Sequence, residues 1–228
     1  SHRALANLLS ALTPLITGSD GRVLCATNIT FDIFITESLL ALALGKTVVL
    51  ANDEEMLLPW KMAELMTTHG VTMLQMTPSR LQMCLGNEAF YQAMARAEII
   101  ITVGEPLNRE LIRLTKATGG VRLMNLYGPV EATVYVSGAE MSGVGRPHIG
   151  KPLANCRIYI LDKQQRPVLP TSPGELYLAG PCLAEGYCND AERTAAVFLP
   201  DPFCPGERMY KTGDLGRLLP DGNIEFLG

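Results

Sequence analysis

Short apolar and β-branched runs alternate with longer segments of helical character through the first two thirds of the chain. Three segments have helical features: Phe31–Leu44, closed by Gly45; Pro59–Thr68, before Gly70; and a segment that Asn108 can cap. Strands that alternate with helices predict βαβ units and a mainly parallel sheet flanked by helices. The five runs that predict strands are Val23–Ala26, Thr47–Leu50, Val71–Met76, Ile99–Val103 and Val121–Leu126.

The pattern changes near Gly150, where turns rich in proline and glycine begin to separate short apolar runs. One short helix is expected at Ala191–Val197, and no long amphipathic helix follows the change. These features predict a small β-rich subdomain with the form of a distorted barrel. We therefore expect an α/β subdomain at residues 1–148 and the β-rich subdomain at residues 149–228. Its strand candidates are Arg157–Leu161, Glu175–Ala179 and Asn223–Leu227.

Composition narrows the classes of protein that fit. Of the 228 residues, 47% are apolar and 18% are charged, and the formal net charge is −4 with mixed signs, which argues against a nucleic-acid partner. No stretch reaches the roughly 18 uncharged apolar residues of a membrane span, so no membrane partner is expected. Ser1-His2-Arg3 shows no signal-peptide pattern and resembles the middle of a protein. The six cysteines form no CxxC pair, so we expect inert thiols in a cytoplasmic protein and no zinc site.

The stretch Asn125-Leu126-Tyr127-Gly128-Pro129-Val130-Glu131 begins at the end of the fifth predicted strand. Ligands of parallel sheets bind beyond the carboxyl ends of the strands. Tyr127 offers a face on which a purine can stack, Gly128 allows close backbone approach to a phosphate, and Glu131 offers a hard oxygen ligand for Mg²⁺. A surface turn with an exposed glutamate explains this stretch equally well when it is taken alone.

Two further stretches carry the same kind of signal. In Tyr210–Leu215 a carboxylate, Asp214, follows Thr-Gly and can accept two hydrogen bonds from a ribose diol, although the stretch alone indicates only a strand that ends in a turn. In Gly174–Tyr187 an alternating strand enters a glycine turn. Each of these stretches taken alone is explained by structure, but their order and spacing together are far more specific.

Together the stretches resemble the adenylation domains of nonribosomal peptide synthetases, a family of adenylate-forming enzymes. Phe31–Phe34 resembles that family's FDxS motif, Asn125–Glu131 its NxYGPTE motif, Gly174–Tyr187 its GELxxxGxxLAxGY motif, and Tyr210–Leu215 its Y(R/K)TGDL motif. The resemblance spans essentially the whole chain and implies a ligase of secondary metabolism. Such an enzyme uses ATP and Mg²⁺ to form an aminoacyl-AMP. It then loads the acyl group onto the phosphopantetheine thiol of a carrier-protein partner within a set of neighbouring synthetase modules.

The resemblance also implies roles for single residues at the nucleotide site. Glu131 would hold Mg²⁺ and serve catalysis, Asp214 would bind the ribose, and Asn125 would reach the adenine amino group. The remaining nucleotide contacts would be Gly104, Glu105, Leu126, Tyr127, Gly128, Val130 and Phe226.

For the amino acid, Asp32 would pair with the substrate's α-ammonium group, which discriminates amino acids from plain acids. The implied side-chain pocket contains no charged residue, so a neutral amino acid of middling or larger size is expected. The pocket residues would be Ile33, Thr36, Gln75, Ile101, Val103, Leu126, Val134 and Tyr135.

Two positions depart from the family pattern, and two parts of the family's site are not in the sequence. Phe34 replaces a serine, and Val130 replaces a threonine whose hydroxyl would touch the α-phosphate, at a cost of roughly 1.5–3 kcal/mol. The phosphate loop and the catalytic lysine are absent from residues 1–228, so this segment alone is expected to adenylate poorly or not at all. Two alternatives remain: an acyl- or aryl-acid ligase of the same superfamily, and a degenerate nucleotide-binding or scaffold module.

Overall fold

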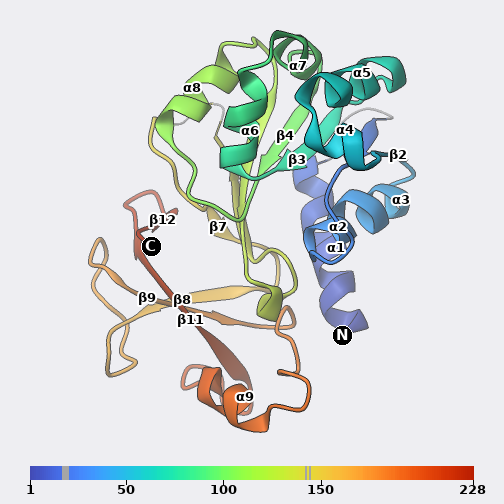
Figure 1. The fold of residues 1–228 in the computed structure, drawn as a ribbon. Helices are drawn as coiled ribbons and strands as arrows, with labels where there is room; N and C mark the ends of the chain where they lie inside the picture. Colours follow the sequence, from blue (N-terminus) through green and yellow to red (C-terminus); the bar gives the residue numbers. More distant parts are fainter. Residues whose placement is uncertain (17–20, 142, 144) are drawn as a thin grey trace. The chain divides into compact units, whose positions relative to one another are not determined.

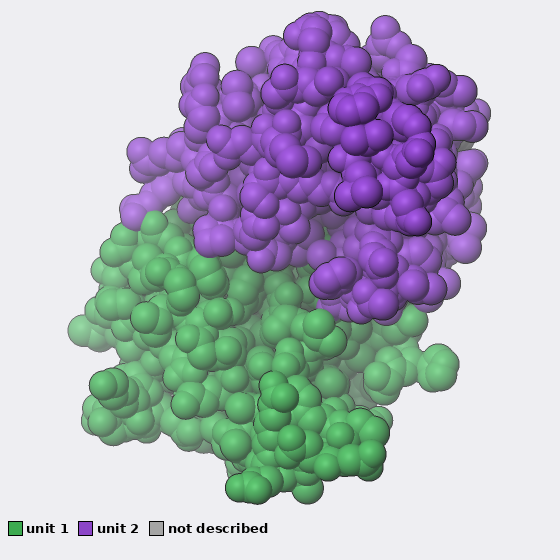
Figure 2. Space-filling view, viewed as in Figure 1, with its two compact units in different colours: residues 1–12, 126–139, 148–228 green, residues 13–125, 140–147 purple. Residues whose placement is uncertain are grey.

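The computed structural model describes residues 1–16, 21–141, 143 and 145–228, and these fold into two compact units. Unit 1 comprises residues 1–12, 126–139 and 148–228, and unit 2 comprises residues 13–125 and 140–147 (Figure 2). Both units therefore draw on separated segments of the chain, and helix α1 (His2–Ile16) contributes to both. The predicted division into residues 1–148 and 149–228 stays a prediction.

Unit 2 is built on a parallel sheet in the strand order β2-β1-β3-β4-β5. Parallel registers such as Val23↔Val48 and Gln75↔Ile101 define the pairing, and the interior strands β3 and β4 are buried along their whole length. All five predicted strands are present, with ends shifted by no more than two residues. Their bounds are β1 Arg22–Cys25, β2 Thr47–Leu50, β3 Met73–Met76, β4 Ile99–Thr102 and β5 Arg122–Tyr127.

Helices connect these strands (Figure 1), and their ends follow from local chemistry. Asn108 caps the helix after β4 by accepting the Leu111 N–H at 2.7 Å, and Gly70 ends the helix before β3 with φ +59°. The segment after β1 contains a π-helical turn, Thr36–Leu40, between two short α-helical pieces. The α-helices are α2 Ile33–Ile35, α3 Ala41–Ala43, α4 Asp53–Leu57, α5 Pro59–His69, α6 Pro78–Leu85, α7 Glu88–Met94 and α8 Arg109–Lys116.

Unit 1 is built on an antiparallel sheet in the order β10-β11-β9-β8, with β12 also paired to β11. Its buried side chains include Leu176, Tyr177 and Met209. Strands β6 and β7 follow β5 in the order of the seven-stranded sheet and pair with each other in antiparallel fashion, with the register Ser137↔Pro152. The bounds are β6 Ser137–Glu140, β7 Lys151–Pro152, β8 Arg157–Leu161, β9 Gly174–Ala179, α9 Ala191–Val197, β10 Phe198–Pro200, β11 Arg208–Leu218 and β12 Ile224–Phe226.

The predicted fold class, a parallel sheet with helices followed by a small β-rich part, is confirmed. One local prediction is wrong: Tyr210–Leu215 does not end in a turn but lies inside the long strand β11. The strand continues because the irregularity is absorbed as a register shift between Lys211 and Leu215, where Gly213 takes φ +83°. In the described residues, no helix is long and apolar enough to cross a membrane.

Candidate functional site

The amino-acid-binding residues predicted in unit 2 lie in the carboxyl halves of β3 and β4 or after the carboxyl ends of strands. Asp32 is half-buried and directly precedes α2, where its carbonyl accepts the Ile35 N–H at 2.9 Å. Ile33, the first residue of α2, is also half-buried. Helix α2 continues directly into the π-helical turn, so Asp32 stands at the start of this combined helical segment.

A hydrogen-bonded pair joins two of the predicted pocket residues. The amide of Gln75 on β3 donates to Thr36 Oγ1 at 3.2 Å, and Thr36 also lies 2.8 Å from the Ile33 carbonyl, to which it donates. Both side chains are almost fully buried, and Gln75 is in register with Ile101 on the neighbouring strand β4. Val103 lies just beyond the end of β4 and is buried. The structure therefore brings the uncharged residues Thr36, Gln75 and Ile101 close together.

The predicted adenine-side residues of unit 2 already have partners of their own. The carboxylate of Glu105 accepts hydrogen bonds from the Ser79 N–H at 2.9 Å and from its hydroxyl at 2.7 Å, at the start of α6. Partial burial raises the pKa of Glu105, but these hydrogen bonds outweigh it and hold the pKa below its ordinary value. Gly104, which precedes Glu105, has φ +80°. The Glu105 carboxylate is thus fixed at the amino end of a helix.

Asn125 is the last residue of unit 2 on β5, and its side chain is oriented by a neighbour. The Thr102 hydroxyl lies 3.1 Å from Asn125 Oδ1 and 3.1 Å from the Met124 carbonyl oxygen. Because Thr102 and Asn125 are both buried, this contact holds the amide in one orientation. A preset amide is what recognition of a base edge requires.

Three predicted nucleotide residues meet in unit 1, from three different strands. The Tyr127 hydroxyl, on β5, donates to Asp214 Oδ2 at 2.5 Å, on β11. The Tyr127 ring lies 5.8 Å from the ring of Phe226, on β12. Burial, together with the Asp214 carboxylate, raises the pKa of Tyr127, so the phenol stays protonated and remains a donor. An aromatic face and a carboxylate therefore adjoin each other, which suits a base and its ribose.

Asp214 is itself positioned by the strand irregularity in β11. Its N–H donates to Thr212 Oγ1 at 2.9 Å, and the Thr212 hydroxyl donates to the Leu176 carbonyl at 2.7 Å. Gly213 lies between them, with its N–H donating to Glu175 Oε1 at 3.1 Å. The Thr-Gly-Asp sequence is thereby held to strand β9, and the half-buried carboxylate of Asp214 is turned toward Tyr127.

Glu131, the predicted magnesium ligand, lies in a short 3₁₀ turn and has a partner that the motifs did not reveal. The Tyr187 hydroxyl donates to Glu131 Oε1 at 2.5 Å, and the Ala184 N–H donates to the Glu131 carbonyl at 2.7 Å. The Arg193 guanidinium stacks 4.1 Å from the centre of the Tyr187 ring. Burial, with Tyr187 and Glu131 nearby, raises the pKa of Tyr210. Tyr187 is the last residue of the third motif, which is the only sequence signal for its role.

Gly128 has a structural reason to be glycine. A Cβ atom there would lie 2.6 Å from the Val134 carbonyl oxygen and 2.7 Å from Tyr135 Cα. Thr133 and Val134, with φ +57° and +66°, both take the left-handed conformation that non-glycine residues rarely adopt. The Thr133 hydroxyl secures this turn by donating to the Cys182 carbonyl at 2.7 Å.

The other predicted residues of this region divide between core and surface. Leu126, Val134 and Tyr135 are no more than 3% exposed, so their side chains are buried. Val130, the residue that departs from the family motif, is 67% exposed. Its side chain therefore makes no packing demand on the turn that carries Glu131.

One cluster of metal-ligand type occurs among the described residues, and it lies apart from Glu131 in sequence. Asp201, Cys204 and Glu207 lie within 4.8 Å of one another through their ligand atoms. Arg157 forms ion pairs with both carboxylates, at 3.4 Å to Asp201 and closely to Glu207. The cluster is therefore explained by charge neutralisation within the fold.

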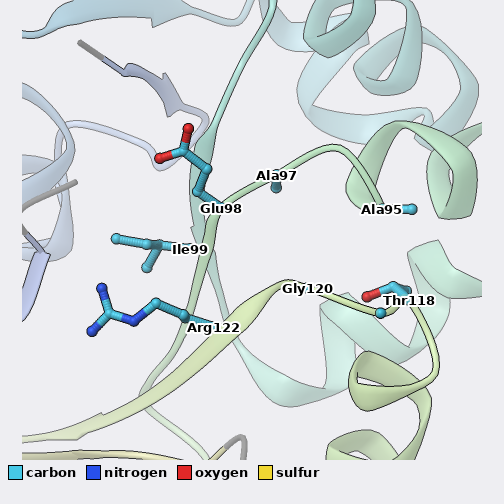
Figure 3. Close-up of a pocket in the computed structure, with 8 residues that line it drawn as sticks. Ala95, Ala97, Glu98, Ile99, Thr118, Gly120 and Arg122 are labelled. Carbon is cyan, nitrogen blue, oxygen red and sulfur yellow. The ribbon is translucent and has the colours of Figure 1, made fainter. Parts of the chain in front are cut away.

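A cavity of about 400 Å³ is present at the other end of the parallel sheet (Figure 3). It adjoins the start of β4 and β5, and no predicted site residue lines it. Its Arg122 is paired with Glu140 at 3.0 Å. Because ligands of parallel sheets bind beyond the carboxyl ends of the strands, this cavity is not the candidate site.

Comparison with known proteins agrees with the motifs and the fold. Residues 1–188 match the family model described as AMP-binding enzyme. Over its full length the chain is 38% identical to a segment of bacitracin synthase 3 from Bacillus licheniformis and 36% identical to a segment of malpibaldin synthetase from Mortierella alpina. In both cases the chain spans about 4% of the relative's length.

The solved structures include crystal structures of the nonribosomal peptide synthetase FmoA3. The whole chain superposes on 25% of that protein with a TM-score of 0.90 and 33% identity, in a form that is bound to AMPPNP. This chain belongs to the AMP-binding enzyme family. The predicted resemblance to nonribosomal peptide synthetase adenylation domains is confirmed.

Proposed function

We propose that this chain is the recognition part of an amino-acid adenylation domain. The domain binds ATP, Mg²⁺ and a neutral amino acid, forms an aminoacyl-AMP, and transfers the aminoacyl group to a carrier-protein thiol. The observation that carries the proposal is the meeting of Tyr127, Asp214 and Phe226 in a chain that belongs to the AMP-binding family. A protonated phenol beside a carboxylate, next to an aromatic ring, fits adenine stacking and ribose binding.

The proposed amino-acid side rests on Asp32 and on the uncharged set around Thr36 and Gln75. A half-buried carboxylate pairs strongly with an ammonium group, and this pairing separates amino acids from plain carboxylic acids. The solved structure of FmoA3 with α-methyl-L-serine-AMP supports an aminoacyl adenylate as the product class. Ile33, Ile101, Val103, Leu126, Val134 and Tyr135 complete the proposed pocket.

The donor set at Glu131 fits a magnesium ion. A half-buried carboxylate is a hard oxygen ligand, and the Tyr187 hydroxyl fixes its orientation through Oε1. Mg²⁺, when bound with ATP, supplies charge neutralisation for attack of one anion on another. Glu131 would hold the ion, while Gly104, Glu105, Asn125, Gly128 and Val130 would line the nucleotide.

Amino-acid-dependent exchange of pyrophosphate into ATP tests this proposal in a complete adenylation domain that contains the chain. A panel of neutral L-amino acids should give exchange, and Asp214→Ala should raise the KM for ATP without changing the preferred amino acid. Asp32→Ala should abolish amino-acid binding in isothermal titration. Binding of aryl acids in place of amino acids would instead favour an acyl- or aryl-acid ligase.

Residues 1–228 alone are expected to adenylate poorly, because they hold neither the phosphate loop nor the catalytic lysine. Turnover of this segment equal to that of a complete domain would contradict that expectation. Val130, in place of the threonine of the family motif, favours a second candidate, a degenerate module that binds nucleotide without chemistry. Nucleotide binding without any exchange in a complete domain would select that candidate. The carrier protein, the neighbouring modules and a cytoplasmic location belong to the same proposal.

A further inference from the structure

Glu37 is a buried carboxylate in the same helical segment as Asp32, and none of the predicted roles uses it. Its side chain is 1% exposed and lies in the π-helical turn of unit 2. Oε2 accepts hydrogen bonds from the N–H groups of Ala26 at 2.9 Å and Thr27 at 3.0 Å. Oε1 accepts the Thr27 hydroxyl at 2.7 Å. All three contacts hold the chain at the point where β1 ends.

This backbone begins the connection that leads from β1 to Asp32. The carbonyl of Ala26 also accepts the Arg80 guanidinium at 3.4 Å, so both polar groups of Ala26 are occupied. Further along, the Phe31 N–H donates to the Asn28 carbonyl at 3.0 Å and closes a turn directly before Asp32. Glu37 therefore ties the start of the connection to the helix at its end.

The π-helical turn explains how one helix makes this contact and also lines the proposed pocket. Thr36 and Glu37 are neighbours in sequence, and both are nearly fully buried. Thr36 faces Gln75, while Glu37 faces Ala26 and Thr27. Such turns are rare insertions in helices and occur frequently at functional sites. A buried carboxylate is costly unless it is fully hydrogen-bonded, so its three hydrogen bonds indicate a specific task.

We propose that Glu37 is a positioning residue, which fixes the segment from Ala26 to Asp32 so that the Asp32 carboxylate meets the α-ammonium group of the substrate. This inference rests on the proposed function, because it takes Asp32 as the ammonium ligand. Glu37 itself touches neither substrate nor nucleotide in this account. It acts on the affinity for the amino acid and not on that for ATP.

Pyrophosphate exchange in a complete adenylation domain tests the inference, with the neutral L-amino acid that gives the highest rate as the probe. Glu37→Ala should raise the KM for that amino acid by at least about tenfold and leave the KM for ATP within about twofold. Glu37→Gln keeps an acceptor for both N–H groups, and its amide can donate to the Thr27 hydroxyl. This conservative variant should therefore restore the KM to within about threefold of the original.

Thr115→Val serves as the matched structural control in the same unit. Thr115 is 1% exposed, and its hydroxyl donates to the Leu111 carbonyl at 2.9 Å within α8. This variant should lower the melting temperature and leave both KM values unchanged. If Glu37→Ala fails to fold, Thr27→Val decides, since it removes one bond to Oε1. It should raise the amino-acid KM by about two- to fivefold, and an unchanged KM would overturn the inference.

The outcomes separate this inference from the proposed function. If the original protein shows no amino-acid-dependent exchange, or if Asp32→Asn leaves the amino-acid KM unchanged, the proposed function fails. If Asp32→Asn raises that KM but Glu37→Ala raises both KM values equally, or neither, only the positioning role of Glu37 is overturned.

Discussion

Gly128→Ala is expected to destabilise unit 1 through a clash between backbone segments. The added Cβ would lie 2.6 Å from the Val134 carbonyl oxygen and 2.7 Å from Tyr135 Cα, and no side-chain rotation relieves contacts with a backbone. The opposing segment is held by the Thr133 hydroxyl and by two left-handed residues, so it yields little. Overpacking of this kind costs about 1–3 kcal/mol.

For a chain of this length, that cost lowers the melting temperature by about 2–12 °C, because each kcal/mol shifts it by about 2–4 °C. Thermal unfolding followed by circular dichroism measures the shift. Gly120→Ala is the matched control, since a Cβ there meets nothing within 4 Å and its backbone is not left-handed. We expect the control to be neutral or slightly stabilising. Equal melting temperatures for the two variants would refute the clash as the reason for glycine at position 128.

Three other predictions concern the site. Tyr187→Phe removes the donor to Glu131 and should raise the Mg²⁺ concentration needed for half-maximal pyrophosphate exchange by about threefold or more; an unchanged requirement would show that Glu131 needs no orientation. Val130→Thr introduces the hydroxyl proposed to touch the α-phosphate and should increase kcat about tenfold to 150-fold, measured by the same exchange, because the missing hydrogen bond costs roughly 1.5–3 kcal/mol. An equal or lower rate would contradict a role for that hydroxyl. Glu37→Gln should flatten the dependence of stability on pH. Burial raises the pKa of Glu37, although hydrogen bonds from Thr27 and Ala26 oppose this shift. The unfolded protein therefore gives up the Glu37 proton more readily than the folded protein does. As pH rises above about 4.5, the ordinary pKa of a glutamate, the original protein loses stability relative to this variant. Urea unfolding between pH 5 and about 8 measures this difference, and a constant difference between the two proteins would contradict it.

Local signals carried most of the fold prediction. Strands β2 and β8 and helix α9 have the predicted bounds, and Asn108 marked the start of α8 because an N-cap chemistry is local. No helix was predicted for the segment between β3 and β4 that contains α6 and α7. Their caps, Thr77 and Asn87, are visible in the sequence, but a short apolar pattern is ambiguous.

Single residues of the candidate site could be proposed from motifs, whereas contacts between segments far apart in the sequence could not. Asp214 and Tyr127 stood out through their motifs, yet their hydrogen bond joins residues 87 positions apart. Tyr187 and Glu131 are 56 positions apart, and no spacing rule connects them. The burial of Glu37 and its hydrogen bonds to backbone N–H groups were not predicted for a different reason. A glutamate inside an apolar helix has no sequence feature that indicates such partners.

Because of the π-helical turn at Thr36–Leu40, this segment is sensitive to the deletion of a single residue. A π turn holds one residue more than a regular α-helical turn. Loss of a single codon here would let the helix close as an α-helix and rotate the residues on one side by about 100° relative to the other. The positions of Asp32 and Glu37 relative to each other would then change, while the sheet would stay intact. One-residue deletions thus change the geometry of this segment in a way that point substitutions do not.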